Sequence, residues 1–330
     1  MKNSSMMLFF TMTVLSVILI INSNNWMSLW MGLEINMMAF ISLIAKSKDH
    51  LISESMMMYF LVQSMGSVMV LLMIILNNSL MFYSMASTMT MNVLMMGMCI
   101  KLGVPPFHSW FPEMMSKLNW IKGLMLMTWQ KIAPMFIMAS CMSNLLMLFI
   151  ILSVLAGALG GLNHTSLRKL IAYSSINHMG WMISCLYFNS NLWMMYLTIY
   201  TIMMTPLTVW MHYNKIYFMN QASVMTKTLT EKMVLSLNML SMGGLPPFIG
   251  FYPKWMIIQS MMENGSKIII IIMVMCSLLT LLYYMRMLTS MFMMNNYMNK
   301  WMIKNKNNKT MKMMFLINMM LPLGMYMFTF

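Results

Sequence analysis

The chain has 330 residues, of which 60% are hydrophobic and only 8% charged, with 20 Lys and Arg against 6 Asp and Glu. Soluble domains carry about 25% charged residues. The composition therefore excludes a soluble enzyme, a nucleic-acid-binding protein and a disordered chain. We interpret the net charge of +14 as the cation bias of a membrane protein, whose meaning lies in which side of the bilayer the cations occupy.

Methionine is unusually frequent, with 60 residues. Core packing has no need of so many flexible side chains, whereas an AT-rich genome that reads an extra isoleucine codon as Met predicts this excess. The N-terminus shows no Arg-rich amphipathic presequence. Both features favour a chain encoded and made inside a mitochondrion. The four cysteines form no CxxC pair, so neither an iron–sulfur cluster nor a structural zinc site is expected.

Eleven apolar segments are long enough to cross a bilayer, which needs about 20 residues. In chain order they cover residues 6–22, 26–45, 56–76, 85–118, 122–141, 145–161, 168–187, 192–212, 231–262, 267–289 and 311–329. The fourth and ninth are too long for one straight helix, and each contains a Gly-X-Pro-Pro sequence near its middle. Each is therefore predicted to be a broken helix.

The distribution of cations tests this count of spans. With the N-terminus inside, 16 of the 20 Lys and Arg fall in inner segments, one lies in an outer loop and three lie within spans. The inner cations are Lys2, Lys46, Lys48, Lys117, Lys122, Arg168, Lys169, Lys215, Lys227, Lys232, Arg286, Lys300, Lys304, Lys306, Lys309 and Lys312. This bias predicts an inside N-terminus and an outside C-terminus.

An internal repeat covers the two broken helices. Residues 103–113 align with residues 244–254 at an offset of 141, with five of eleven positions identical and two more aromatic in both copies. The copies lie on the fourth and ninth spans, an odd number of crossings apart, so they are predicted to cross the membrane in opposite directions. Inverted repeats with paired broken helices are typical of ion transporters, and the breaks point to the transport site.

Four ionisable residues lie well inside spans: Glu34, Lys101, Lys131 and Lys254. Each is costly there, about 2.5–3.5 kcal/mol on insertion scales. Three lie eight or nine residues from one end of their span, which is about 12–13 Å deep, and Lys101 lies just before the first break. A lateral row of proton-relay groups is the favoured interpretation, because a buried lysine gains or loses a proton in response to small changes in field. The alternative is a static ion pair of Glu34 with one lysine, which leaves two lysines unexplained.

The histidines are weaker candidates. His108 directly follows the first break, and His178 lies beside two serines on the seventh span, so both are second-rank residues for a proton path. A structural, hydrogen-bonded histidine is an equal alternative for each. His164 and His178 are 14 residues apart, a spacing seen in haem-ligand pairs, but the further pairs that such haems need are lacking.

Four motifs carry a resemblance to a known family. They are residues 32–36 (GLEIN), 101–110 (KLGVPPFHSW), 161–175 (GLNHTSLRKL continuing to AYSS) and 243–255 (GGLPPFIGFYPKW). In these runs the chain resembles the family of subunit 2 of mitochondrial NADH:ubiquinone oxidoreductase (respiratory complex I), in an arthropod-like version. The resemblance extends over essentially the whole chain.

The resemblance implies an all-α, antiporter-like membrane fold with two inverted five-helix repeats. Repeat one is expected at about 1–187, with the broken helix 85–118, and repeat two at about 192–330, with the broken helix 231–262. It also implies that the family's proton-channel acid corresponds to Glu34 and its three channel lysines to Lys101, Lys131 and Lys254. His164 lies where relatives often have Gln, so no shared role is assigned to it.

The expected function is proton translocation by a membrane-arm subunit in the mitochondrial inner membrane, without cofactors of its own. NADH, FMN, iron–sulfur clusters and ubiquinone are expected on partner subunits. The expected partners are other membrane-arm subunits, including antiporter-like neighbours, and phospholipids, with no nucleic acid. Two alternatives stay open at this point: an autonomous H⁺/Na⁺ antiporter of the same fold, and a structural scaffold whose polar row is vestigial.

Overall fold

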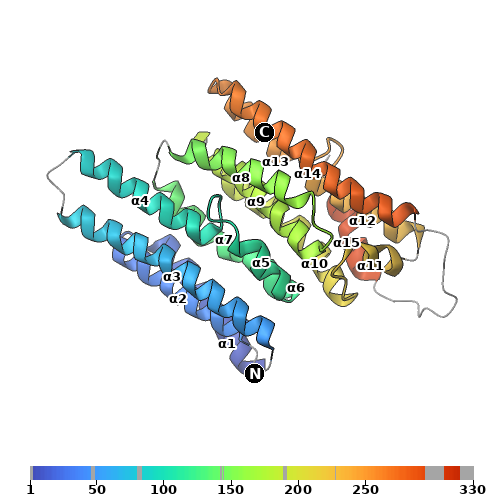
Figure 1. Cartoon of the computed structure of the whole chain (residues 1–330), viewed down its shortest axis with the longest axis horizontal. Coiled ribbons are helices and arrows are strands. Elements are labelled where there is room, and N and C mark those ends of the chain that lie inside the picture. The colour runs from blue at the N-terminus through green and yellow to red at the C-terminus, as the bar shows by residue number, and fades with distance from the viewer. Residues whose placement is uncertain are drawn as a thin grey trace. The chain divides into compact units, whose positions relative to one another are not determined.

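The structure is a computed structural model and describes residues 3–45, 49–79, 84–141, 143, 145–188, 192–226, 228–293 and 308–319. Its helices are α1 (Asn3–Asn22), α2 (Trp26–Ile44), α3 (His50–Ser79), α4 (Ser84–Leu102), α5 (Trp110–Lys117), α6 (Trp120–Met127), α7 (Trp129–Ala139), α8 (Leu145–Gly161), α9 (Leu167–Phe188), α10 (Leu192–Tyr213), α11 (Met219–Met225), α12 (Leu229–Gly243), α13 (Phe251–Glu263), α14 (Lys267–Met293) and α15 (Asn308–Met319) (Figure 1). Within the described residues the only other regular pairing is one isolated antiparallel bridge, between Ser166 and Phe218. The all-α prediction is confirmed.

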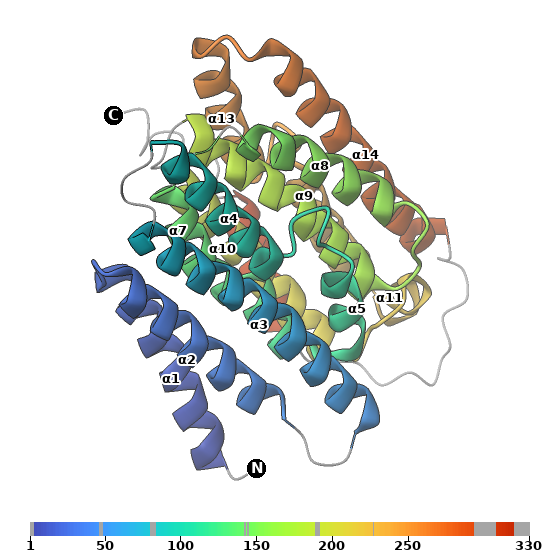
Figure 2. The ribbon, with the colours of Figure 1, turned by 60° about the vertical axis from the view of Figure 1, so that its left-hand side comes forward.

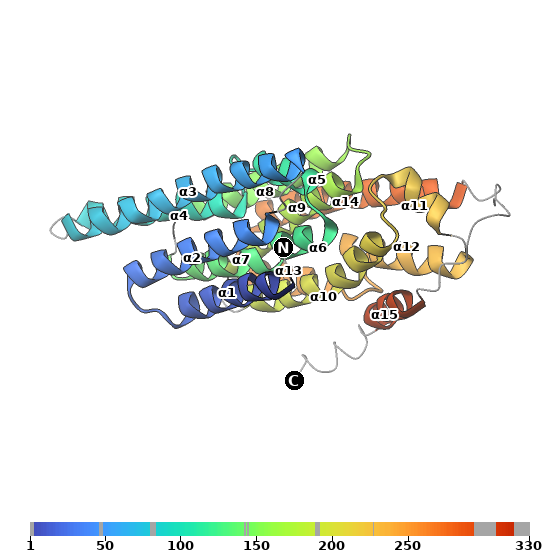
Figure 3. The same cartoon turned by 90° about the horizontal axis from the view of Figure 1, so that it is seen from below.

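The chain forms two compact units, unit 1 (Met1–Leu152) and unit 2 (Ser153–Phe330). In unit 1, α3 packs against α2, α4 and α5 (Figure 2), and α7 packs against α1, α4 and α6. In unit 2, α10 packs against α9, α12, α13 and α15, and α14 packs against α9, α11, α12 and α13. Figure 3 shows α15 next to α12. Each unit therefore has its own helical core.

Several helices expose apolar stripes that a bilayer would cover. On α14, Ile271, Met275, Leu278 and Leu282 recur on one face and are 54% to 63% exposed. Among the described residues, five helices (α1, α2, α3, α10 and α14) are long and apolar enough to span a membrane, and α4 and α8 contain shorter apolar stretches. Because water would strongly disfavour such stripes, the chain is a membrane protein.

Both predicted helix breaks are confirmed. The segment 85–118 consists of α4 and α5, and the segment 231–262 consists of α12 and α13. At each break a glycine follows the first half-helix with positive φ, +70° at Gly103 and +80° at Gly244. The prolines at 105–106 and 246–247 lack the N–H groups that would continue the helix.

The sequence did not predict every element. The expected span 122–141 is interrupted at Thr128 (φ −117°, ψ −72°), where the backbone N–H and the side-chain hydroxyl both donate to the Leu124 carbonyl. This divides the segment into α6 and α7. The short helix α11 lies in a predicted loop, and most of the expected last span, 311–329, lies beyond the described residues.

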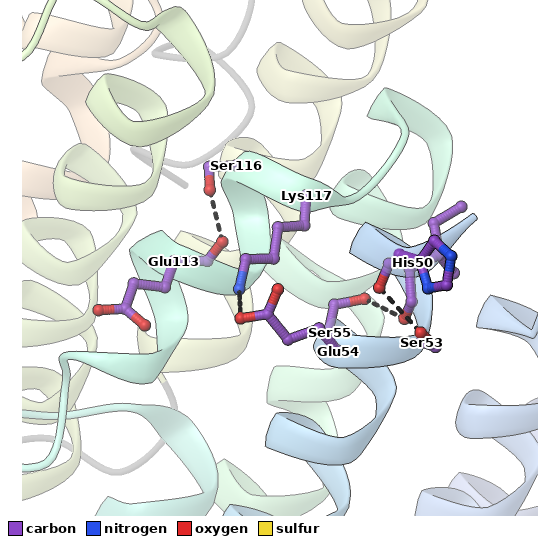
Figure 4. A network of polar contacts seen from close by, with 8 residues as sticks. His50, Ser53, Glu54, Ser55, Glu113, Ser116 and Lys117 are labelled. Carbon is purple, nitrogen blue, oxygen red and sulfur yellow. Dashed lines mark hydrogen bonds and ion pairs between the residues drawn. The ribbon is translucent and has the colours of Figure 1, made fainter.

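Segments that the cation bias assigns to the inner side meet within each unit. In unit 1, Lys117 forms an ion pair with Glu54 (Figure 4), and the Lys122 ammonium donates to the Ile44 carbonyl at 3.0 Å. In unit 2, the backbone N–H of Leu167 donates to the Tyr217 carbonyl at 2.9 Å. Arg286 of α14 donates to the carbonyls of Leu162 and His164 in the same region. Lys232, which was counted with these cations, is buried near the start of α12, with 5% of its surface exposed.

Candidate functional site

Lys101 lies one residue before the end of α4, at the first break. Its side chain is 6% exposed and runs past Gly66 of α3, where an added Cβ would lie 2.6 Å from the Lys101 Cγ. Gly66 thus leaves room for the lysine between two closely packed helices. The break positions Lys101 beside irregular backbone, which is tolerated at membrane depth only in protein or at a hydrated cavity.

A polar cavity lies beside Lys101 in unit 1. Its polar lining side chains come from four helices and are Asn36, Tyr59, Gln63, Lys101, Gln130 and Lys131. Two predicted relay lysines therefore share one cavity. Apolar side chains, including those of Phe111 and Trp110, complete the wall.

Neutral amides organise this cavity. Asn36 and Gln130 form a reciprocal pair, with Asn36 Nδ2 donating at 2.8 Å and Gln130 Nε2 donating back at 3.2 Å. The Tyr59 hydroxyl also donates to Gln130 at 3.4 Å. Gln63 Nε2 donates to the backbone carbonyl of Lys101 at 3.0 Å. Because carboxamides both donate and accept, they can order water without binding a proton.

The sequence predicts that Glu34 and Lys101 lie within ion-pair or one-water reach of each other. These two described side chains form no ion pair, and Glu34 is half-buried on α2 while its neighbours Leu33 and Asn36 line the cavity. Glu34 is nevertheless close enough for its charge to act on Lys101.

Lys131 lies near the start of α7 and is 2% exposed. Its ammonium is 5.5 Å from the centre of the Phe111 ring, a cation–π contact. Pro134, one turn further along α7, lacks the N–H that would bond the Gln130 carbonyl. The lysine therefore lies beside a locally weakened stretch of helix.

Lys254 lies in unit 2 on α13, directly after the second break, and is 4% exposed. Its ammonium donates to the Gly243 carbonyl at 2.8 Å and lies 5.6 Å from the Trp181 ring centre. His178 lies one turn before Trp181 on α9, and its Nδ1 is 2.7 Å from the Tyr196 hydroxyl. Lys254 of α13 thus contacts α9 at Trp181, one turn from His178.

His108 and His164 lie in connections between helices. His108 is half-buried in the connection between α4 and α5. His164 lies in the loop before α9, where partial burial, followed by the charges of Lys169 and Arg286, holds its pKa below the usual value. The loop therefore lies within the field of two cationic side chains, those of Lys169 and Arg286.

Sequence reasoning missed the neutral members of the site. Three polar side chains lie inside apolar spans: Asn36, Gln63 and Gln130. Burying a polar group in a bilayer costs free energy, as burying a charge does, so the sequence could have identified them as candidates too. Their pairing was not available, because 94 residues separate Asn36 from Gln130.

Comparisons with known proteins agree with this architecture. Residues 23–280 match the family model described as NADH:quinone oxidoreductase/Mrp antiporter, transmembrane. The chain is 41% identical to NADH-ubiquinone oxidoreductase chain 2 of Anopheles gambiae, over 98% of this chain and 96% of that one. It is 38% identical to the same chain of Locusta migratoria, over 98% and 96%.

The fold also matches a solved structure. A chain of respiratory complex I from Thermus thermophilus superposes with a TM-score of 0.85 at 19% identity, over 98% of this chain and 78% of that one. At that identity the match concerns the fold alone. The antiporter-like fold and the resemblance drawn from the sequence motifs are confirmed, and the chain belongs to the NADH:quinone oxidoreductase/Mrp antiporter transmembrane family.

Proposed function

We propose that this chain is a proton-translocating membrane-arm subunit of respiratory complex I. The observation that carries the proposal is the polar cavity shared by Lys101 and Lys131, two buried lysines on different helices next to a helix break. Intramembrane ionisable residues are costly and are retained mainly where they serve transport. The assignment to complex I is inferred from the insect relatives, which are named NADH-ubiquinone oxidoreductase chain 2.

In this proposal the proton moves along Glu34, Lys101, Lys131 and Lys254. A change in field or conformation from the partner subunits acts first on Glu34 and Lys101. Lys101 and Lys131 then exchange a proton through water in their cavity, which the carboxamides of Asn36 and Gln130 orient. Lys254 is the last lysine of the row. His178 and His108 are second-rank members of the path.

The redox reaction belongs to the partners. NADH oxidation and ubiquinone reduction take place on other subunits, which also carry FMN and the iron–sulfur clusters, and this chain contributes to the enzyme through proton transfer. The partners are the other membrane-arm subunits, including antiporter-like neighbours, with phospholipids covering the exposed apolar stripes.

The proposed topology has eleven crossings in the mitochondrial inner membrane, with the N-terminus in the matrix and the C-terminus in the intermembrane space. It is supported by the cation bias and by the contacts that join predicted inner segments within each unit, such as Lys117 with Glu54 and Arg286 with the loop after α8.

The inverted repeat is supported beyond the two breaks. The same offset of 141 residues takes α2 onto residues 167–185 of α9, and it aligns Asn36 with Asn177 and Tyr59 with Tyr200. This offset pairs α1–α7 with α8–α10 and α12–α14, so in the proposed repeat α8 and α9 belong to the second copy rather than to the first, where the expected bounds 1–187 placed them.

The test is Lys131→Met in the intact assembly, because Met fills a similar volume without charge. Protons pumped per NADH should fall at least about tenfold while assembly is kept. The matched control is Lys122→Met, which alters a lysine that donates to the Ile44 carbonyl and does not line the cavity. Normal pumping by an assembled Lys131→Met variant would favour a static role. Sodium-driven exchange by the chain alone would favour the autonomous antiporter.

A further inference from the structure

The second helix break leaves backbone carbonyls without their usual donors. In a continuous helix the carbonyls of Met242 and Gly243 would accept from the N–H groups of residues 246 and 247. Both of those residues are prolines and have no N–H. The break therefore creates two acceptors that must find partners elsewhere, because an unpaired buried carbonyl is costly.

The Gly243 carbonyl finds its partner in Lys254. The ammonium donates to this oxygen at 2.8 Å, across the connection between α12 and α13. A backbone carbonyl offers only an acceptor, and a hydrogen bond from a charged donor is about twice as strong as one from a neutral donor. The oxygen consequently holds the ammonium more firmly than it would hold a neutral amine.

Gly244 makes the approach of Lys254 possible. A Cβ at this position would lie 2.8 Å from the lysine Cδ and 2.9 Å from its Nζ. Gly244 is also at φ +80°, a conformation that residues with a side chain rarely adopt. The turn and the path of the lysine thus require a glycine for two separate reasons.

From these contacts we infer that Pro247, Gly244 and the Gly243 carbonyl form a docking position that holds the Lys254 ammonium at the second break. The inference rests on the proposed function, since it concerns how one relay lysine is positioned. Pro247 keeps the carbonyl free of a backbone donor, and Gly244 leaves the space for the side chain. When Lys254 gives up its proton, its bond to Gly243 weakens and the side chain is released.

Two variants of the intact assembly test the docking position. Pro247→Ala restores an N–H that competes for the Gly243 carbonyl, whereas Pro246→Ala restores one for the Met242 carbonyl, which Lys254 does not use. Proton pumping and NADH oxidation are measured from about pH 6 to pH 9. Pro247→Ala should lower the ratio of pumping at the alkaline end to pumping at neutral pH by about threefold, and Pro246→Ala should leave it unchanged.

A parental pH profile in assembled Pro247→Ala would overturn the inference. A map of the unaltered assembly supplies a second readout if Pro247→Ala fails to assemble. Lys254 Nζ within hydrogen-bond reach of the Gly243 oxygen supports docking, and a clearly longer separation refutes it. Lys254→Met separates the two claims: if it pumps like the parent, the proposed relay fails, whatever the proline variants show.

Discussion

The two broken helices solve the same backbone problem with different donors. At the first break Pro105 leaves the Lys101 carbonyl without an N–H, and the neutral amide of Gln63 donates to it at 3.0 Å. At the second break Pro247 leaves the Gly243 carbonyl open, and the charged side chain of Lys254 donates to it. The first break is closed by a group that cannot titrate, while the second is closed by a group that can.

In unit 1, therefore, different side chains satisfy the backbone carbonyl at the break and carry the proposed proton transfer. In unit 2, one side chain has both roles. Because Gln63 donates to the Lys101 backbone carbonyl, the Lys101 side chain is not needed there and can respond to the charge of Glu34 and to the cavity. Lys254 both completes the break and is the proposed relay lysine. Movement of Lys254 is therefore expected to alter the backbone at the second break, whereas proton transfer at Lys101 leaves the first break intact.

The largest effect is expected for Gly244→Ala. Both Gly103→Ala and Gly244→Ala force a side chain into positive φ, which costs about 1–2 kcal/mol. At Gly244 the new Cβ would also displace Lys254, whereas at Gly103 it would meet the Phe111 Cβ at 3.2 Å. Gly244→Ala should therefore reduce pumping at least about tenfold more than Gly103→Ala does. The measurement is proton pumping per NADH together with thermal stability of the assembly.

Gly265→Ala provides the matched control for backbone strain. Gly265 has φ +74°, and nothing lies within 4 Å of an added Cβ. It should show the loss of stability without the loss of pumping. Equal pumping by the Gly244 and Gly103 variants would remove the distinction between the two breaks.

The breaks were predictable from sequence because proline and glycine act locally. Each break combines two consecutive prolines with a glycine at positive φ, whereas the single prolines Pro134 and Pro206 lie inside the helices α7 and α10. The interruption at Thr128 carries no such signal, because Thr128 itself bonds the Leu124 carbonyl and only the fold reveals that choice. The helix α11 likewise depends on contacts with α14 rather than on its own short sequence.

For the site too, the residues that local sequence reveals differ from those that only tertiary packing brings together. The buried lysines were evident from their cost within apolar segments. Their partners were not, because Gln63, Gln130 and the Gly243 carbonyl are brought near them only by tertiary packing. The structure shows no direct ion pair between Glu34 and Lys101, since similar depth in two spans does not determine which way two side chains extend, and their connection through one water stays a prediction.

A smaller effect is expected for Gln63→Leu. Leucine has a similar size but no donor, so the Lys101 carbonyl is left unsatisfied at a cost of about 1–3 kcal/mol. The thermal inactivation midpoint of the assembly should fall. In the Pro105→Ala background an N–H becomes available to the same carbonyl, so Gln63→Leu should cost less there. Equal costs in both backgrounds would mean that Gln63 does not act by closing the break.

The smallest effect concerns the ends of the units that the proposed topology places on the matrix side, which repeat the contrast between the breaks. In unit 1 Lys117 is paired with the carboxylate of Glu54, while in unit 2 Arg286 is held by the carbonyls of Leu162 and His164. No ion pair with a described acidic side chain offsets Arg286, and His164 lies within the field of Arg286 and Lys169. Protonating His164 adds a further positive charge to this end of unit 2.

The sign of the pH dependence follows from the lowered pKa of His164. Because the folded chain binds this proton less readily than the unfolded chain, whose His pKa is about 6.5, stability is lost as the pH falls through and below that value. The loop carries the bond from the Leu167 N–H to the Tyr217 carbonyl. Hydrogen exchange of that amide, compared at the same pH between the parent and His164→Gln, should show faster opening of the parent in acid and no difference above neutrality. The same exchange rate in both proteins at about pH 5 would contradict this prediction. It would mean that the carbonyls bound to Arg286 offset its charge, as the Glu54 carboxylate offsets that of Lys117, so that protonating His164 does not destabilise the loop.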